Sequence, residues 1–246
     1  MDAEKDIQIE RREGDEMIRA TLMDGQVRVM MCETTRMVQR AADIHHSTPV
    51  CTAAMGRLMT ATSMLGVMMK GENESVTVNI KGGGPMGTVV AVANHGDLKV
   101  CADDPQVELP LREDGKLNVG AAIGKDGYMT VIKDLGLREP YIGQIELRSP
   151  MFSDISREMT FAPKEELLED WFRGMDLKVL ERMPLQYNCG CSRYRMEKAL
   201  ISLGRRELQN IIDEDTGAEL GCHFCHSKYA FSTQELKELL ARASRD

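Results

Sequence analysis

The feature that most constrains this chain is a set of four cysteines in its last quarter. Cys189-Gly190-Cys191 and Cys222-His223-Phe224-Cys225 form two close pairs, thirty residues apart. Two thiol pairs that a fold brings together place four sulfurs at tetrahedral corners, the coordination that Zn²⁺ takes at Zn–S distances of ~2.3 Å. The spacing therefore predicts one Zn²⁺ per chain, bound by Cys189, Cys191, Cys222 and Cys225.

The spacing alone leaves two kinds of zinc site open. One is a purely structural zinc ribbon. The other is a site that oxidants can dismantle: only Gly190 separates Cys189 from Cys191, so this pair stays close without the metal and can form a local disulfide. His223 and His226 are weaker candidate ligands, because four thiolates already complete the shell. A single nucleophilic cysteine is also disfavoured, since paired thiols indicate coordination.

Residues 189–246 are expected to form a compact module that depends on its metal. A structural zinc contributes about 10–16 kcal/mol to folding, whereas a core of this size contributes ~5 kcal/mol or less. Helices are predicted over residues 192–203 and 206–213. Ser232-Thr233-Gln234-Glu235 is a capping box and predicts a third helix through Leu240.

The N-terminal part of the chain contains segments in which apolar and polar residues alternate, as in β-strands, and two segments with helical periodicity. Residues 16–32 are two alternating runs around Asp24-Gly25 and predict a β-hairpin. Residues 34–45 and 52–70 have helical spacing, and the second helix is apolar all round and expected to be buried. His45 and His46, at the end of the first helix, are expected at the surface.

Short β-branched runs follow at residues 76–80, 88–92 and 128–132 and predict strands. The expected fold is therefore α+β, with a mostly antiparallel sheet and helices over residues 1–147. Residues 148–188 are expected to be a linker that contains a short amphipathic helix over residues 165–172. Residues 189–246 form the small C-terminal zinc module.

Charge and hydropathy exclude several classes of protein. The 31 basic and 39 acidic residues give a net charge of −8, which disfavours nucleic acid as a partner. No run of ~18 apolar residues occurs, and the first residues are charged, so we expect neither a membrane partner nor a signal peptide. Seven cysteines, an odd number, then indicate reduced thiols and a cytoplasmic protein.

The sequence resembles the heat shock protein 33 family, the redox-regulated holdase chaperones. The residues that carry the resemblance are Cys189-Gly190-Cys191-Ser192-Arg193, Ala199-Leu200-Ile201-Ser202-Leu203-Gly204, Cys222-His223-Phe224-Cys225, Tyr229-x-Phe231, Gly83-Gly84-Pro85-Met86-Gly87 and Tyr141-Ile142-Gly143. The resemblance implies that the four cysteines bind zinc in the reduced, inactive protein. It also implies that oxidation forms Cys189–Cys191 and Cys222–Cys225 disulfides and releases zinc. The linker then unfolds, and the protein, commonly a dimer, binds unfolding client proteins without being an enzyme.

One stretch departs from the family. After Ile145-Glu146-Leu147 the family continues for a few dozen residues that Ser149 to Phe161 replace here, so the resemblance covers about residues 15–147 and 163–242. We expect the shortened centre to leave an exposed sheet edge or apolar patch, because the helix over residues 52–70 needs a full sheet to cover it. Self-association of the reduced protein is the expected consequence.

Two other functions compete with this interpretation. A zinc-ribbon interaction or nucleic-acid-binding module would use the basic residues Arg193, Arg195, Lys198, Arg205 and Arg206. The acidic residues nearby favour a solvated charged face instead: Glu207, Asp213, Glu214, Asp215 and Glu219. An oxidoreductase that uses the C-x-x-C pair would turn over thiols steadily, but the sequence lacks the catalytic context of such enzymes.

Overall fold

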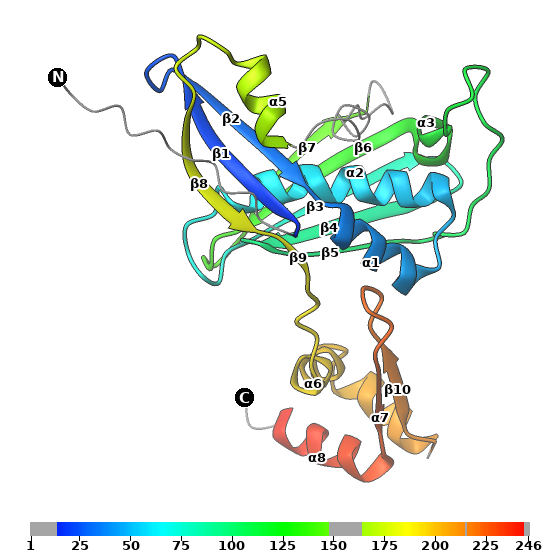
Figure 1. Cartoon of the computed structure of the whole chain (residues 1–246). Coiled ribbons are helices and arrows are strands. Elements are labelled where there is room, and N and C mark those ends of the chain that lie inside the picture. The colour runs from blue at the N-terminus through cyan, green and yellow to red at the C-terminus, as the bar shows by residue number, and fades with distance from the viewer. Residues whose placement is uncertain (1–13, 148–163, 215, 244–246) are drawn as a thin grey trace. The chain divides into compact units, whose positions relative to one another are not determined.

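The computed structural model describes residues 14–147, 164–214 and 216–243, and Figure 1 traces them. The chain divides into two compact units, Met1–Asn188 and Cys189–Asp246. Each unit is described by itself below.

The first unit contains a six-stranded sheet with the strand order β7-β6-β3-β4-β5-β9. Its strands are β3 (Ser75–Gly83), β4 (Thr88–Asn94), β5 (Asp97–Ala102), β6 (Gly124–Asp134), β7 (Tyr141–Glu146) and β9 (Gln186–Tyr187). All neighbours are antiparallel except β5 and β9. The expected mostly antiparallel sheet is confirmed.

A second, three-stranded antiparallel sheet has the order β2-β1-β8. The predicted hairpin forms β1 (Glu16–Leu22) and β2 (Val27–Glu33), and β8 (Lys178–Pro184) adds the third strand. Helix α2 (Pro49–Gly66) packs between the two sheets, against β3, β4 and β5 on one side and β2 on the other (Figure 1). Its buried residues lie at the centre of the main hydrophobic core.

The helices of this unit follow the predicted positions, with shifted ends. Helix α1 (Thr35–His45) matches the first predicted helix, and a short helix α3 (Val119–Ile123) was not predicted. Helix α2 begins three residues earlier than predicted, because Pro49 occupies its first turn, where no backbone N–H donor is needed. The expectation for His45 was wrong: it is 3% exposed, and its Nε2 lies 2.8 Å from the carbonyl oxygen of Val100.

The part of the expected linker that the structure describes belongs to the first unit: one helix packs on the three-stranded sheet, β8 is a strand of that sheet and β9 is a strand of the six-stranded sheet. The predicted helix is confirmed as α5 (Lys164–Trp171). Leu167 and Leu168 of α5 pack against Ile18 and Met31 of the sheet, on the face opposite to α2. The three-part division of the chain stays a prediction, and residues 148–163 lie outside the described residues.

The second unit contains three helices and a hairpin. The three predicted helices are confirmed as α6 (Arg193–Ser202), α7 (Arg205–Asp213) and α8 (Thr233–Ala243). The antiparallel strands β10 (Ala218–Gly221) and β11 (Lys228–Phe231) were not predicted. Six buried apolar side chains of this unit form a small cluster: Leu200, Leu208, Ile212, Phe231, Leu236 and Leu239.

Candidate metal centre

The four cysteines lie on two segments of the second unit. Cys189 and Cys191 precede α6, whose first turn is capped by the Ser192 hydroxyl, which accepts a hydrogen bond from the Arg195 N–H. Cys222 and Cys225 lie in the turn between β10 and β11. Two backbone hydrogen bonds close this turn, from Cys222 N–H to the Ser227 carbonyl and from His226 N–H to the Cys222 carbonyl.

The structure brings the four sulfurs into one cluster. They all lie within 4.8 Å of one another. The Sγ atoms of Cys189 and Cys222 are 3.6 Å apart, and those of Cys191 and Cys225 are 3.3 Å apart. Four sulfurs bound at ~2.3 Å to one tetrahedral ion are ~3.8 Å apart. The four side chains therefore fit a tetrahedral metal ion with small adjustments.

The electrostatics of the cluster favour a cation. Burial raises the pKa of Cys189 to about 12 and also raises the pKa of Cys191. Burial acts in the same direction at Cys225, but hydrogen bonds from the Ser227 side chain and backbone and from neighbouring thiols outweigh it and lower the pKa of Cys225 to about 6. Four thiolates carry a local charge of −4, so their full ionisation needs a positive ion between them.

Two polar contacts of the cluster were not singled out from the sequence. The hydroxyl oxygen of Tyr229 lies 3.1 Å from Cys191 Sγ, and that of Ser227 lies 3.2 Å from Cys225 Sγ. The hydrogen bond to Cys191, followed by burial, raises the pKa of Tyr229 to about 12, so its hydroxyl remains a donor. Such contacts orient metal ligands. The signal that the sequence offered was proximity: Ser227 and Tyr229 lie two and four residues after Cys225.

A second set of contacts ties the cysteine segments to α8. The Arg193 guanidinium donates to the Ala230 carbonyl, pairs with Glu235 and lies 4.2 Å from the centre of the Phe231 ring. The predicted capping box is confirmed, since the Ser232 hydroxyl accepts from Glu235 N–H while the Glu235 carboxylate accepts from Ser232 N–H. These contacts hold the start of α6 beside β11 and α8.

The remaining candidate ligands stand apart from the cluster. Within the described ranges, the group of possible ligand atoms that comes together contains the four cysteines and neither His223 nor His226. Cys32, Cys51 and Cys101 belong to the first unit. The described residues also include no helix that is both long and apolar enough to span a bilayer.

Fold and site together define an α+β protein with a C-terminal four-cysteine module. A family model described as Hsp33 protein matches residues 15–157 and 149–232. The chain belongs to the Hsp33 family.

Curated relatives and a solved structure agree with this assignment. The 33 kDa chaperonins of Caldanaerobacter subterraneus and Clostridium beijerinckii are 35% and 36% identical, over 94% and 92% of this chain and 99% and 98% of theirs. The crystal structure of the 33 kDa chaperonin (heat shock protein 33 homolog) from Thermotoga maritima aligns with a TM-score of 0.82 and 25% identity, over 94% of this chain and 99% of that one. The α+β class is thereby confirmed, and the family is one of chaperones.

The comparisons also locate the shortened centre. The alignment with the Caldanaerobacter protein spans 291 positions, more than the 246 residues of this chain, so part of the relative has no counterpart here. The two matches to the family model overlap at residues 149–157. The missing stretch therefore follows β7 closely, as the sequence predicted, although residues 148–163 themselves lie outside the described residues.

Proposed function

We propose that this protein is a redox-regulated holdase chaperone of the cytoplasm, which binds unfolding proteins when its four-cysteine centre is oxidised. The observation that carries the proposal is the cluster of Cys189, Cys191, Cys222 and Cys225 in a chain of the Hsp33 family. In the reduced protein these four thiolates hold one Zn²⁺, which supplies the cross-link between the two halves of the small second unit.

Oxidation removes this cross-link. Four thiolates, two equivalents of hydrogen peroxide and four protons give two disulfides and four waters, and the sulfurs lose the negative charge that binds the metal. The family resemblance assigns the disulfides as Cys189–Cys191 and Cys222–Cys225. Neither disulfide joins the two segments, so the second unit keeps only its small hydrophobic core and unfolds.

The proposed client-binding surface is the apolar surface between α5 and the three-stranded sheet. This helix covers Ile18 and Met31, which are 1% and 5% exposed. When α5 unfolds, Ile18 and Met31 become exposed on the three-stranded sheet, and Leu167 and Leu168 become exposed on the unfolded segment. Exposed apolar patches of this kind bind other proteins that expose apolar residues. No catalytic turnover belongs to this mechanism, and a homodimer of the oxidised form is part of the proposal.

A peroxide time course tests the mechanism. Zinc release, the fluorescence of Trp171, which is the only tryptophan, and suppression of client light scattering are followed together. We expect one zinc per reduced chain, and zinc loss, fluorescence change and protection that develop together and reverse with reductant and zinc. Protection that is as strong before oxidation, or complete while zinc stays bound, contradicts the proposal.

Two variants make the test specific. Cys189→Ser/Cys222→Ser is expected to lose zinc and its dependence on peroxide. Cys101→Ser, in the first unit, is the matched control and is expected to retain both. A nucleic-acid-binding module would instead show salt-dependent binding to nucleic acid, but Arg193, one of its candidate residues, is engaged by Glu235 and the Ala230 carbonyl.

A further inference from the structure

Strand β7 is the edge strand of the six-stranded sheet next to β6. It pairs with β6, and within the described part of the chain no strand pairs with its other edge. All six of its residues are exposed, and the exposed fractions of Tyr141, Ile142 and Ile145 are 63%, 66% and 57%. An exposed edge strand with apolar side chains is a template for pairing with another strand.

The apolar residues of this edge lie on both faces of the sheet. Ile145 is opposite Met129 of β6, and Gly143 is opposite Val131. Met129 and Val131 pack against the main core, so Ile145 and, by alternation, Tyr141 lie on the core side of the sheet. They are nevertheless exposed, because α2 packs mainly against β3, β4 and β5, which lie further from this edge.

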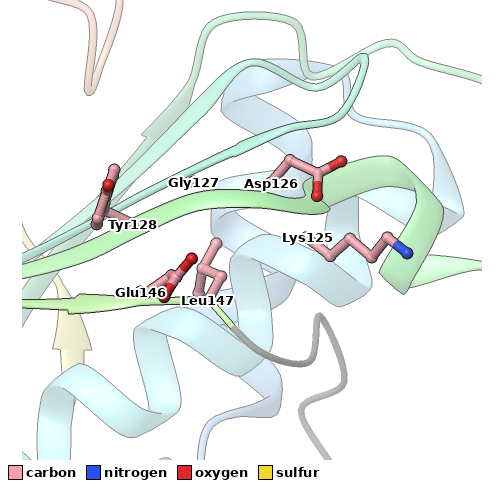
Figure 2. A pocket seen from close by; sticks show the side chains of 6 residues that line it. All are labelled: Lys125, Asp126, Gly127, Tyr128, Glu146 and Leu147. Atoms are coloured by element: carbon pink, nitrogen blue, oxygen red, sulfur yellow. The ribbon is translucent and has the colours of Figure 1, made fainter.

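This edge is also where the chain differs from its relatives. The part of the Hsp33 family that has no counterpart here comes soon after β7. An open hollow lies at the end of the strand, lined by Lys125, Asp126, Gly127, Tyr128, Glu146 and Leu147, as Figure 2 shows. Its charged groups favour water at that end. The apolar part of the edge is therefore confined to residues 141–145.

We propose that β7 pairs with β7 of a second copy of this chain in the reduced protein. Two antiparallel edge strands of identical chains are related by a two-fold axis perpendicular to the sheet, which keeps each face on its own side. Residues on the core side of one copy therefore lie opposite residues on the core side of the other copy. An axis through Gly143 places Tyr141 of each copy opposite Ile145 of the other, and Ile142 opposite Gln144.

This register is self-complementary. It forms two aromatic–β-branched cross-strand pairs, which are among the favourable pairs in antiparallel sheets. Glu146, the only charged residue of β7, falls opposite Pro140, outside the strand, so no like charges meet. An axis through Gln144 is less favourable, because it places Glu146 opposite Ile142 twice. The dimer needs no oxidant and thus goes beyond the proposed chaperone mechanism.

Sedimentation velocity of the reduced, zinc-loaded full chain tests this inference. The wild type is expected to be dimeric within the range of about 1–100 µM. Tyr141→Lys and Ile145→Glu are each expected to weaken the dimer about tenfold or more, because a charge then faces an apolar side chain across the axis. Leu137→Lys, at a 60% exposed leucine before β7, is the matched control and is expected to dimerise as the wild type does.

Rescue tests the register itself. The double variant Tyr141→Lys/Ile145→Glu places opposite charges across both pairs and is expected to dimerise within a few-fold of the wild type. An equimolar mixture of the two single variants is expected to form heterodimers, which checks that each variant is folded. A monomeric wild type, unchanged single variants, or a double variant as weak as the single ones would overturn the inference.

Discussion

The ammonium nitrogen of Lys164 lies 3.3 Å from a carboxylate oxygen of Glu16, and both side chains are only 4% exposed. The same ammonium lies 2.7 Å from Glu33, and Arg182 lies 2.6 Å from Glu16. The first residue of α5 is thus joined to β1 and β2 of the sheet that the helix covers. In the proposed mechanism, this network holds the client surface closed.

Replacing Lys164 should loosen α5. The substitution Lys164→Met keeps the aliphatic stem but removes the positive charge beside the carboxylates of Glu16 and Glu33. Removing one partner of a buried ion pair costs about 3 kcal/mol. We expect faster hydrogen exchange of residues 164–171 and client protection at a lower extent of oxidation. Arg173→Met is the control: Arg173 and its partner Asp170 are 80% and 62% exposed, so the substitution should cost at most about 0.5 kcal/mol. Unchanged exchange in Lys164→Met would show that the network does not anchor the helix.

The hydroxyl of Tyr229 should strengthen metal binding. Tyr229→Phe removes the hydrogen bond to Cys191 but keeps the ring, and loss of such a contact to a ligand typically costs 10- to 100-fold in metal affinity, so about that loss is expected. Competition with a chromophoric chelator under reducing conditions measures it. Tyr194→Phe, at a 63% exposed tyrosine of α6, should bind zinc as the wild type does. Equal affinities of the two variants would remove Tyr229 from the site.

Asp15 should make the first unit less stable as the pH rises. Its carboxylate accepts hydrogen bonds from the Arg36 and Met37 N–H groups at the start of α1, 2.9 and 2.6 Å away. Burial nevertheless raises its pKa above the ordinary 3.8. The folded state therefore holds the proton more tightly, and the contribution of Asp15 is fully present below pH 3.8 and is lost as the pH rises through the folded-state pKa.

Urea unfolding followed by Trp171 fluorescence checks this sign. The free energy of unfolding of the wild type minus that of Asp15→Asn, which does not titrate, should fall as the pH rises above 3.8. Subtracting the two free energies of unfolding removes the contributions of all groups that titrate in the same way in both proteins. A difference that grows with pH over the same window would mean that the charged carboxylate stabilises α1 instead.

The sequence predicted elements whose signals are local and missed contacts between distant residues. Asp24-Gly25 located the hairpin, Ser232 and Glu235 located α8, and the two cysteine pairs located the four-sulfur cluster, because each signal lies within a few residues. Lys164 and Glu33 are 131 positions apart, and neither marks the other in the sequence. The buried state of His45 likewise depends on the carbonyl of Val100 in a distant strand. Such contacts follow from packing, which periodicity does not specify.

Removal of the metal alone should unfold the second unit and leave the first one folded. The second unit has six buried side chains in its core, while the first unit has a large core around α2. Zinc contributes about 10–16 kcal/mol to small metal domains, more than a core of that size provides. With a chelator and a reductant, hydrogen exchange should become fast throughout residues 189–243 and remain slow in α2 and β3 to β5. Protection that persists in α6 to α8 without metal would show that the hydrophobic cluster suffices, and that oxidation must act by another route than loss of zinc.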